Sequence, residues 1–108
     1  MVEPEECQSM AEVRAGVDEV DERIVALLAV RMRFMDAAAR IKSRRDQVRD
    51  EDRKAAVIAH ARDAAARFGF PPAVAARLYD ELIEASISHE LERFDMLAAA
   101  PPSASASG

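Results

Sequence analysis

The sequence predicts an all-α protein of three helices per protomer, one long, one of medium length and one long. Half of the 108 residues are hydrophobic but only 5% are aromatic, and there are just 3 glycines. This composition is typical of helices that pack through alanine and aliphatic side chains. Apolar residues recur at steps of three and four, and no segment alternates as a β-strand does.

The first helix is expected to begin at Ser9 or Met10 and to end near Lys42. Ser9 can cap it, and Glu12, three residues later, completes a capping box. A helix of about 50 Å is too long for a domain of this size to cover by itself, so its apolar stripe requires a partner. The stripe consists of Met10, Val13, Val17, Val20, Ile24 and Leu27, and it resumes at Phe34, Ala38 and Ile41.

Two shorter signals divide the rest of the chain into helices. Residues 43–50, SRRDQVRD, are expected to form a polar connection, and Asp50 is a good N-cap for a second helix that stops at Gly69. Pro71 and Pro72 can open the third helix. Its stripe comprises Leu78, Leu82, Ile83, Ser86, Ile87, Glu90, Phe94 and Leu97.

The chain is expected to contain one domain. We expect an N-terminal extension over residues 1–8, one helical domain over 9–98 and a disordered tail over 99–108.

Composition and charge exclude several classes of protein. The net charge of −5 argues against nucleic acid or an anionic membrane as a partner. The acidic start lacks the apolar core of a signal peptide, and no apolar run reaches membrane-span length. A cytoplasmic protein is therefore predicted. Its single Cys7 allows no intrachain disulfide and, like His60 and His89, lacks metal-ligand spacing.

Charged residues interrupt the apolar stripes. Arg31 stands where the stripe of the first helix requires an apolar residue, and Lys42 falls within about 20° of it, about 16 Å along the axis. The gap between them suits a small molecule with several negative charges. Arg14 lies about 25 Å from Arg31 on the same helix. If two copies pair antiparallel about residue 25, residue i is level with residue 50 − i, and Arg14 of the second copy is level with position 36, between Arg31 and Lys42.

The third helix adds Ser86 and Glu90 to one face, and Arg53 begins the second helix. A carboxylate on an apolar stripe is costly unless it pairs with a cation or is protonated. Simpler explanations stay open for the cations, since Arg31 can extend its charge to the surface and Lys42 can stabilise a helix C-terminus.

The segments VRAGVDEVDERIVALLAVRMRF…AARIK, VRDEDR and LIEASISHE together resemble the all-helical chorismate mutases and the related isochorismate pyruvate lyases. This resemblance implies an interlocked antiparallel homodimer that rearranges chorismate, a dicarboxylate, to prephenate without a cofactor or metal. It implies catalytic roles for Lys42 and Glu90. It also implies substrate binding by Arg14 from the partner protomer and by Arg31, Asp50, Arg53 and Ser86.

Two positions depart from the family pattern. Bacterial mutases often carry a glutamine at the position of Glu90, whose amide donates to the ether oxygen, so we expect Glu90 to act protonated and activity to be favoured at acidic pH. Lys54 stands where mutases often have a glutamate that faces the ring hydroxyl. The opening PEEC resembles the lyases, which give salicylate and pyruvate, whereas VRDEDR favours the mutases. A helical dimerisation module without catalysis is the third alternative.

Overall fold

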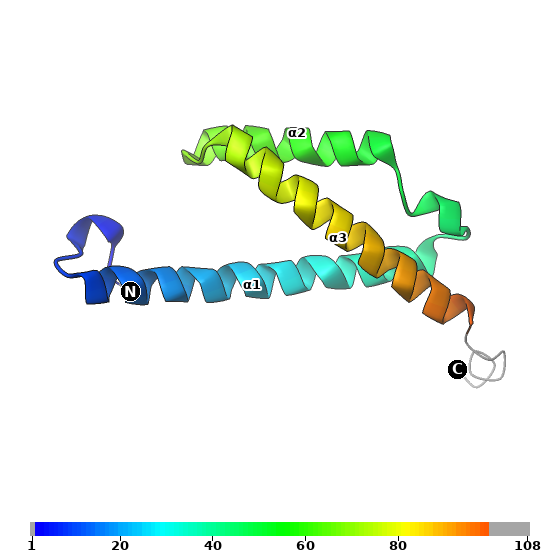
Figure 1. Ribbon diagram of the computed structural model, residues 1–108, viewed down its shortest axis with the longest axis horizontal. Coiled ribbons are helices and arrows are strands. Elements are labelled where there is room, and N and C mark those ends of the chain that lie inside the picture. The colour runs from blue at the N-terminus through cyan, green and yellow to red at the C-terminus, as the bar shows by residue number, and fades with distance from the viewer. Residues whose placement is uncertain (1, 100–108) are drawn as a thin grey trace. The chain divides into compact units, whose positions relative to one another are not determined.

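The computed structural model describes residues 2–99, and these residues form helices and no strand. Three α-helices, α1 (Met10–Ile41), α2 (Glu51–Phe68) and α3 (Pro72–Ala98), follow the predicted order of long, medium and long (Figure 1). Two short 3₁₀ helices, η1 (Pro4–Glu6) and η2 (Arg45–Gln47), precede α1 and α2. The all-α prediction is therefore confirmed. Apart from Ala99, the expected tail lies outside the described residues.

The chain forms two units, one up to Phe34 and the other from Met35 onward. The first unit contains η1 and most of α1, and the second contains the end of α1, η2, α2 and α3. Within residues 2–99, no helix combines the length and the apolar character that crossing a membrane requires.

The capping box predicted for α1 is present. The Glu12 amide donates to Ser9 Oγ at 3.2 Å, as expected. The Glu12 carboxylate accepts from the amide of Gln8 at 3.0 Å, so the reciprocal bond ties down the residue before Ser9 and anchors the N-terminal segment to the helix. The apolar stripe of α1 is exposed, with Leu27 at 69% and Phe34 at 66% of full exposure.

Helix α2 begins and ends at the two capping residues that the sequence predicts, Asp50 and Gly69. The Asp50 carboxylate accepts from the Arg53 amide at 3.0 Å, which satisfies one of the free donors at the helix start. At the other end Gly69 adopts φ +75°, and the Phe70 amide donates to the Ala65 carbonyl at 2.8 Å. This left-handed residue reverses the chain, and α3 begins at Pro72 directly afterwards.

The core of the second unit lies where α2, α3 and the connection before α2 meet. Its buried centre is Val48, Ile83 and Ile87, and each such side chain contributes about 1.5–3 kcal/mol when fully buried. The prediction of a wholly polar connection is wrong at Val48, which is only 5% exposed. The 3₁₀ turn of η2 ends at this residue and directs it into the core.

Candidate functional site

An ion pair joins the end of α1 to α3. Lys42 Nζ donates to Glu90 Oε2 at 2.7 Å, across 48 residues of sequence. The Glu90 side chain is 5% exposed and that of Lys42 is 30% exposed, so the carboxylate is buried and the ammonium reaches water. The sequence left two alternatives for Glu90, a partner cation or protonation, and the structure pairs it with the cation of Lys42.

The ion pair as it stands employs the carboxylate as an acceptor. Donation from a protonated Glu90 to a substrate oxygen therefore stays a prediction.

Ser86 lies one helical turn before Glu90 on the same face of α3, and both are buried. The Ser86 hydroxyl donates to the Leu82 carbonyl at 2.7 Å, a bond within the helix. The structure thus brings together three of the predicted site residues, Lys42, Ser86 and Glu90, at one place in the second unit.

Asp50 and Arg53 lie together at the first turn of α2. The Asp50 side chain caps the helix, so its structural role is established by the hydrogen bond to the Arg53 amide, and its contact with substrate stays a prediction. The Arg53 side chain lines a cavity of about 790 Å³ between α2 and α3. The rest of the lining is largely alanine with Phe68 and Tyr79, and Lys42 and Glu90 are not part of it.

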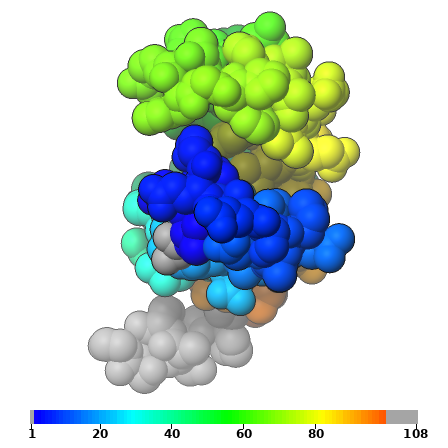
Figure 2. Space-filling model, turned by 90° about the vertical axis from the view of Figure 1, so that its left-hand side faces the viewer, coloured from blue at the N-terminus to red at the C-terminus, as the bar shows by residue number. Residues whose placement is uncertain are grey.

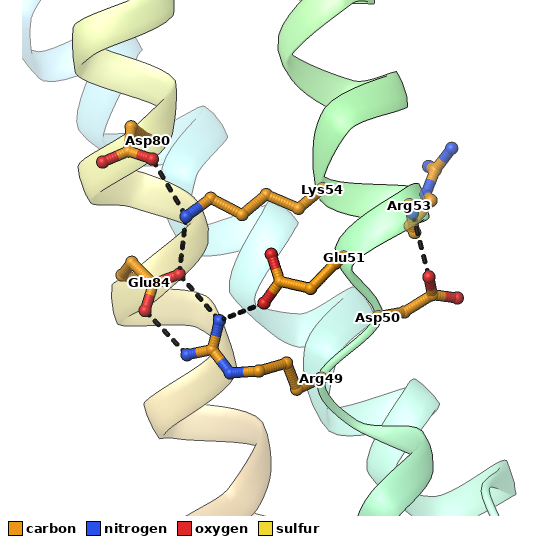
Figure 3. A network of polar contacts seen from close by, with 7 residues as sticks. All are labelled: Arg49, Asp50, Glu51, Arg53, Lys54, Asp80 and Glu84. Carbon is orange, nitrogen blue, oxygen red and sulfur yellow. Dashed lines mark hydrogen bonds and ion pairs between the residues drawn. The ribbon is translucent and has the colours of Figure 1, made fainter.

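A network of charges on the other side of the same turn connects α2 to α3 (Figure 3). Arg49 binds both carboxylate oxygens of Glu84, at 2.7 and 3.1 Å. Lys54 Nζ lies 2.8 Å from Glu84 and 2.9 Å from Asp80. Arg49 and, to a lesser extent, Lys54 lower the pKa of Glu84 to about 2, and hydrogen bonds to Glu84 and Asp80 raise the pKa of Lys54. We call Arg49, Lys54, Asp80 and Glu84 the α2–α3 charge network.

Sequence reasoning did not find this network, because its partners lie on different helices, with 30 residues of sequence from Lys54 to Glu84 and 35 from Arg49 to Glu84, and no local spacing pairs them. A second contact of this kind joins α1 and α3, where His89 Nε2 lies 2.6 Å from Asp36 Oδ1. His89 is thus a half-exposed partner of a carboxylate. Among residues 2–99, no group of three or more His, Cys, Asp or Glu could hold a metal ion.

The remaining predicted site residues, Arg14 and Arg31, belong to the first unit. Arg14 is exposed and Arg31 is half-buried on α1. Substrate binding by the two arginines, and the crossing of Arg14 to a second protomer, stay predictions.

Comparison with known proteins identifies the family. The sequence model of the family described as chorismate mutase type II matches residues 13–91. The match begins just before Arg14 and ends just after Glu90, so it includes every predicted site residue. No curated protein matches the chain. Since the matched segment covers well over half of the 108 residues and the structure has the expected helices, the chain belongs to the chorismate mutase type II family.

Proposed function

We propose that the protein is a chorismate mutase that converts chorismate to prephenate in a cationic pocket at the interface of a homodimer. The observation that carries the proposal is the buried Glu90 carboxylate held by Lys42 at 2.7 Å, one turn from the buried Ser86. A buried ion pair is costly to maintain for stability alone, and charged groups kept in such a place commonly serve binding or catalysis.

The chemistry of the reaction suits these side chains. The rearrangement is a pericyclic [3,3] shift, which needs no nucleophile, metal or obligatory proton transfer. Catalysis comes from holding the compact reactive conformer of the substrate and from stabilising charge as the ether bond breaks. In this proposal Lys42 donates to the ether oxygen and to a carboxylate, Glu90 donates to the ether oxygen when protonated, and Ser86 orients the substrate.

The two substrate carboxylates require cations besides Lys42. Arginine binds a carboxylate through a planar pair of donors, and it never loses its charge at physiological pH. Arg31 of the same protomer, Arg53 at the start of α2 and Arg14 of a second protomer take this role in the proposal. Asp50, whose carboxylate caps α2, fixes the helix turn from which Arg53 extends.

The exposed apolar stripe of α1 supports the homodimer. Side chains such as Leu27 and Phe34, both more than 60% exposed, belong to an apolar stripe along a 32-residue helix that only Arg31 interrupts between them. Apolar exposure on this scale is typical of an interface. A two-fold near residue 25 pairs the stripe with its own copy and carries Arg14 across to the other protomer, so each dimer has two sites.

Parallel turnover assays of chorismate and isochorismate test the proposal, each at about pH 5.5 and about pH 7.5. We expect prephenate from chorismate, formed faster at the lower pH. Salicylate as the dominant product would instead assign the protein to the isochorismate pyruvate lyases. No turnover of either substrate would leave a helical dimerisation module.

A pair of variants connects the activity to the site. Lys42→Ala should lower kcat/KM by about 100-fold or more, because the donor to the breaking bond is removed. Arg40→Ala is the matched control, since Arg40 is an exposed cation near the same end of α1. Equal losses in the two variants, or none in Lys42→Ala, would show that the ion pair does not act on the substrate.

A further inference from the structure

The first unit contains an apolar cavity of about 300 Å³ beside the first turns of α1. Five residues of α1 line it: Val13, Gly16, Val17 and Val20, at positions i, i+3, i+4 and i+7, and Asp21 at its edge. This is the spacing of the four residues that make a hole for an inserted side chain when two helices pack together. We call this cavity the Gly16 hole.

The N-terminal segment makes the wall of the Gly16 hole. Val2, Pro4 and Cys7 line the cavity, and the segment turns back beside the helix (Figure 1). Its 3₁₀ turn is closed by the hydrogen bond from the Cys7 amide to the Pro4 carbonyl, and the Gln8 amide is held by the Glu12 carboxylate. Figure 2, which faces this end of the chain, shows the segment in dark blue around the start of the helix. Hydrogen bonds therefore hold the wall of the Gly16 hole in place beside α1.

A side chain of suitable size lies on the same apolar stripe. Phe34 is 66% exposed, and a buried phenylalanine ring is among the largest contributors to an interface. It cannot enter the hole of its own chain, because Phe34 lies 18 positions after Gly16, about 27 Å along the helix. In an antiparallel pair with a two-fold near residue 25, position 34 of one copy is level with position 16 of the other.

The charges of α1 favour this antiparallel arrangement. Residues 10–25 contain five acidic and two basic residues, whereas residues 26–41 contain one acidic and three basic residues. Antiparallel pairing places the acidic half of each helix beside the basic half of the other, and parallel pairing would place like charges together. Complementary charge of this kind sets orientation and suppresses the wrong register.

We propose that Phe34 of a second copy inserts into the Gly16 hole and sets the register of the homodimer. The inference rests on the dimer of the proposed function and goes beyond it by naming the side chain and the receiving site. Two such contacts form per dimer. They lie on either side of the two-fold, and they fix the register in which Arg14 of one copy is level with position 36 of the other.

The absence of tryptophan from the sequence gives a direct probe of the hole. In Phe34→Trp the single indole should emit as a buried fluorophore at dimer concentrations, and its emission should shift to the red on dilution to monomer. Cys7 lines the hole, and a thiol in contact with an indole quenches its fluorescence. Adding Cys7→Ser should therefore raise the emission of the dimer and leave that of the monomer unchanged. An indole exposed in the dimer, or emission indifferent to Cys7, would overturn the proposal.

Dimer affinity gives a second test that does not depend on one probe. Phe34→Ala should weaken the dimer by at least about tenfold for each contact, and Gly16→Leu should weaken it because its own side chain fills the hole. The double variant should bind more tightly than the two single effects predict, since leucine then occupies the space the ring has left. Additive effects would show that the two positions do not meet. Val25→Ala, at a position that is exposed and off the stripe, is the control.

The inference about the dimer contact and the proposed function can be refuted independently of each other. A wild-type chain that sediments as a monomer at micromolar concentration overturns the inference whatever its activity. A dimer with coupled effects at positions 16 and 34 but with no turnover of chorismate supports the inference and rejects the proposed function.

Discussion

The variant Lys42→Met tests how much the Lys42–Glu90 ion pair contributes to stability. Methionine has a similar length and no charge, so the substitution keeps the packing of the aliphatic stem and removes the ammonium. It leaves a carboxylate that is 5% exposed without the donor that holds it at 2.7 Å. The free energy of unfolding at neutral pH should therefore fall.

The magnitude follows from the unequal burial of the two partners. Removing one member of a fully buried pair costs about 3–5 kcal/mol, because an uncompensated charge is left inside. Lys42 is 30% exposed, so water already screens part of the attraction, and the expected loss is about 2–3 kcal/mol. Glu90→Gln keeps a hydrogen-bond acceptor and frees an ammonium that can reach water, so its cost is about 1 kcal/mol.

Urea unfolding of the two single variants and the double variant distinguishes a buried charge from a general packing defect. The double variant Lys42→Met/Glu90→Gln has no charge at the site, so it should be more stable than Lys42→Met alone. All chains are compared at one concentration, because the stability of a dimer depends on it. A double variant as unstable as the sum of the singles would refute the reasoning, as would a neutral Lys42→Met. Arg40→Met, on the exposed side of α1, should change stability by no more than about 0.5 kcal/mol.

Substitutions at three other positions have predicted effects on stability or activity. The pKa of Glu84 is lowered from 4.5 to about 2, so its ion pairs stabilise the fold above pH 4.5 and this contribution is lost as the pH falls toward 2; Glu84→Gln should flatten this part of the pH–stability curve, and the exposed Glu81→Gln should not. Gly69→Ala should cost about 1 kcal/mol in thermal unfolding experiments, because φ is +75° and no atom lies within 4 Å of the added Cβ, which leaves backbone strain as the cause. Arg31→Ala should abolish turnover and leave a dimer of unchanged or higher stability in sedimentation experiments; an altered oligomeric state would identify Arg31 as a register device.

The helices were predictable because their ends carry local signals. Ser9 with Glu12, Asp50 and Gly69 each fix a terminus by hydrogen bonds or backbone conformation within a few residues, and the structure has the helix boundaries within a residue or two of those expected. The ion pair of Glu90 was predictable only in part. A carboxylate on an apolar stripe requires either a cation or a proton, and the sequence did not decide between them or name Lys42 as the partner.

Features that depend on the path of a loop were not predictable. Val48 is one apolar residue in the charged segment SRRDQVRD, and only the 3₁₀ turn at residues 45–47 shows that it enters the core. The wall of the Gly16 hole likewise comes from the fold of the residues before Ser9, which the sequence indicated only as an extension. Periodicity describes faces of helices, and it carries no information about where an irregular segment turns.

Position 54 carries a lysine where mutases often have a glutamate, and the interactions of this side chain differ accordingly. The resemblance to the mutases suggests a contact with the ring hydroxyl of the substrate here, made by a glutamate. Lys54 instead lies between Asp80 and Glu84 at 2.9 and 2.8 Å, with its side chain 18% exposed. A substrate contact would require the ammonium to leave both carboxylates, and a glutamate at position 54 would add a third negative charge beside them. Lys54 and the two carboxylates therefore join α2 to α3, and in the proposed reaction another group would have to bind the ring hydroxyl.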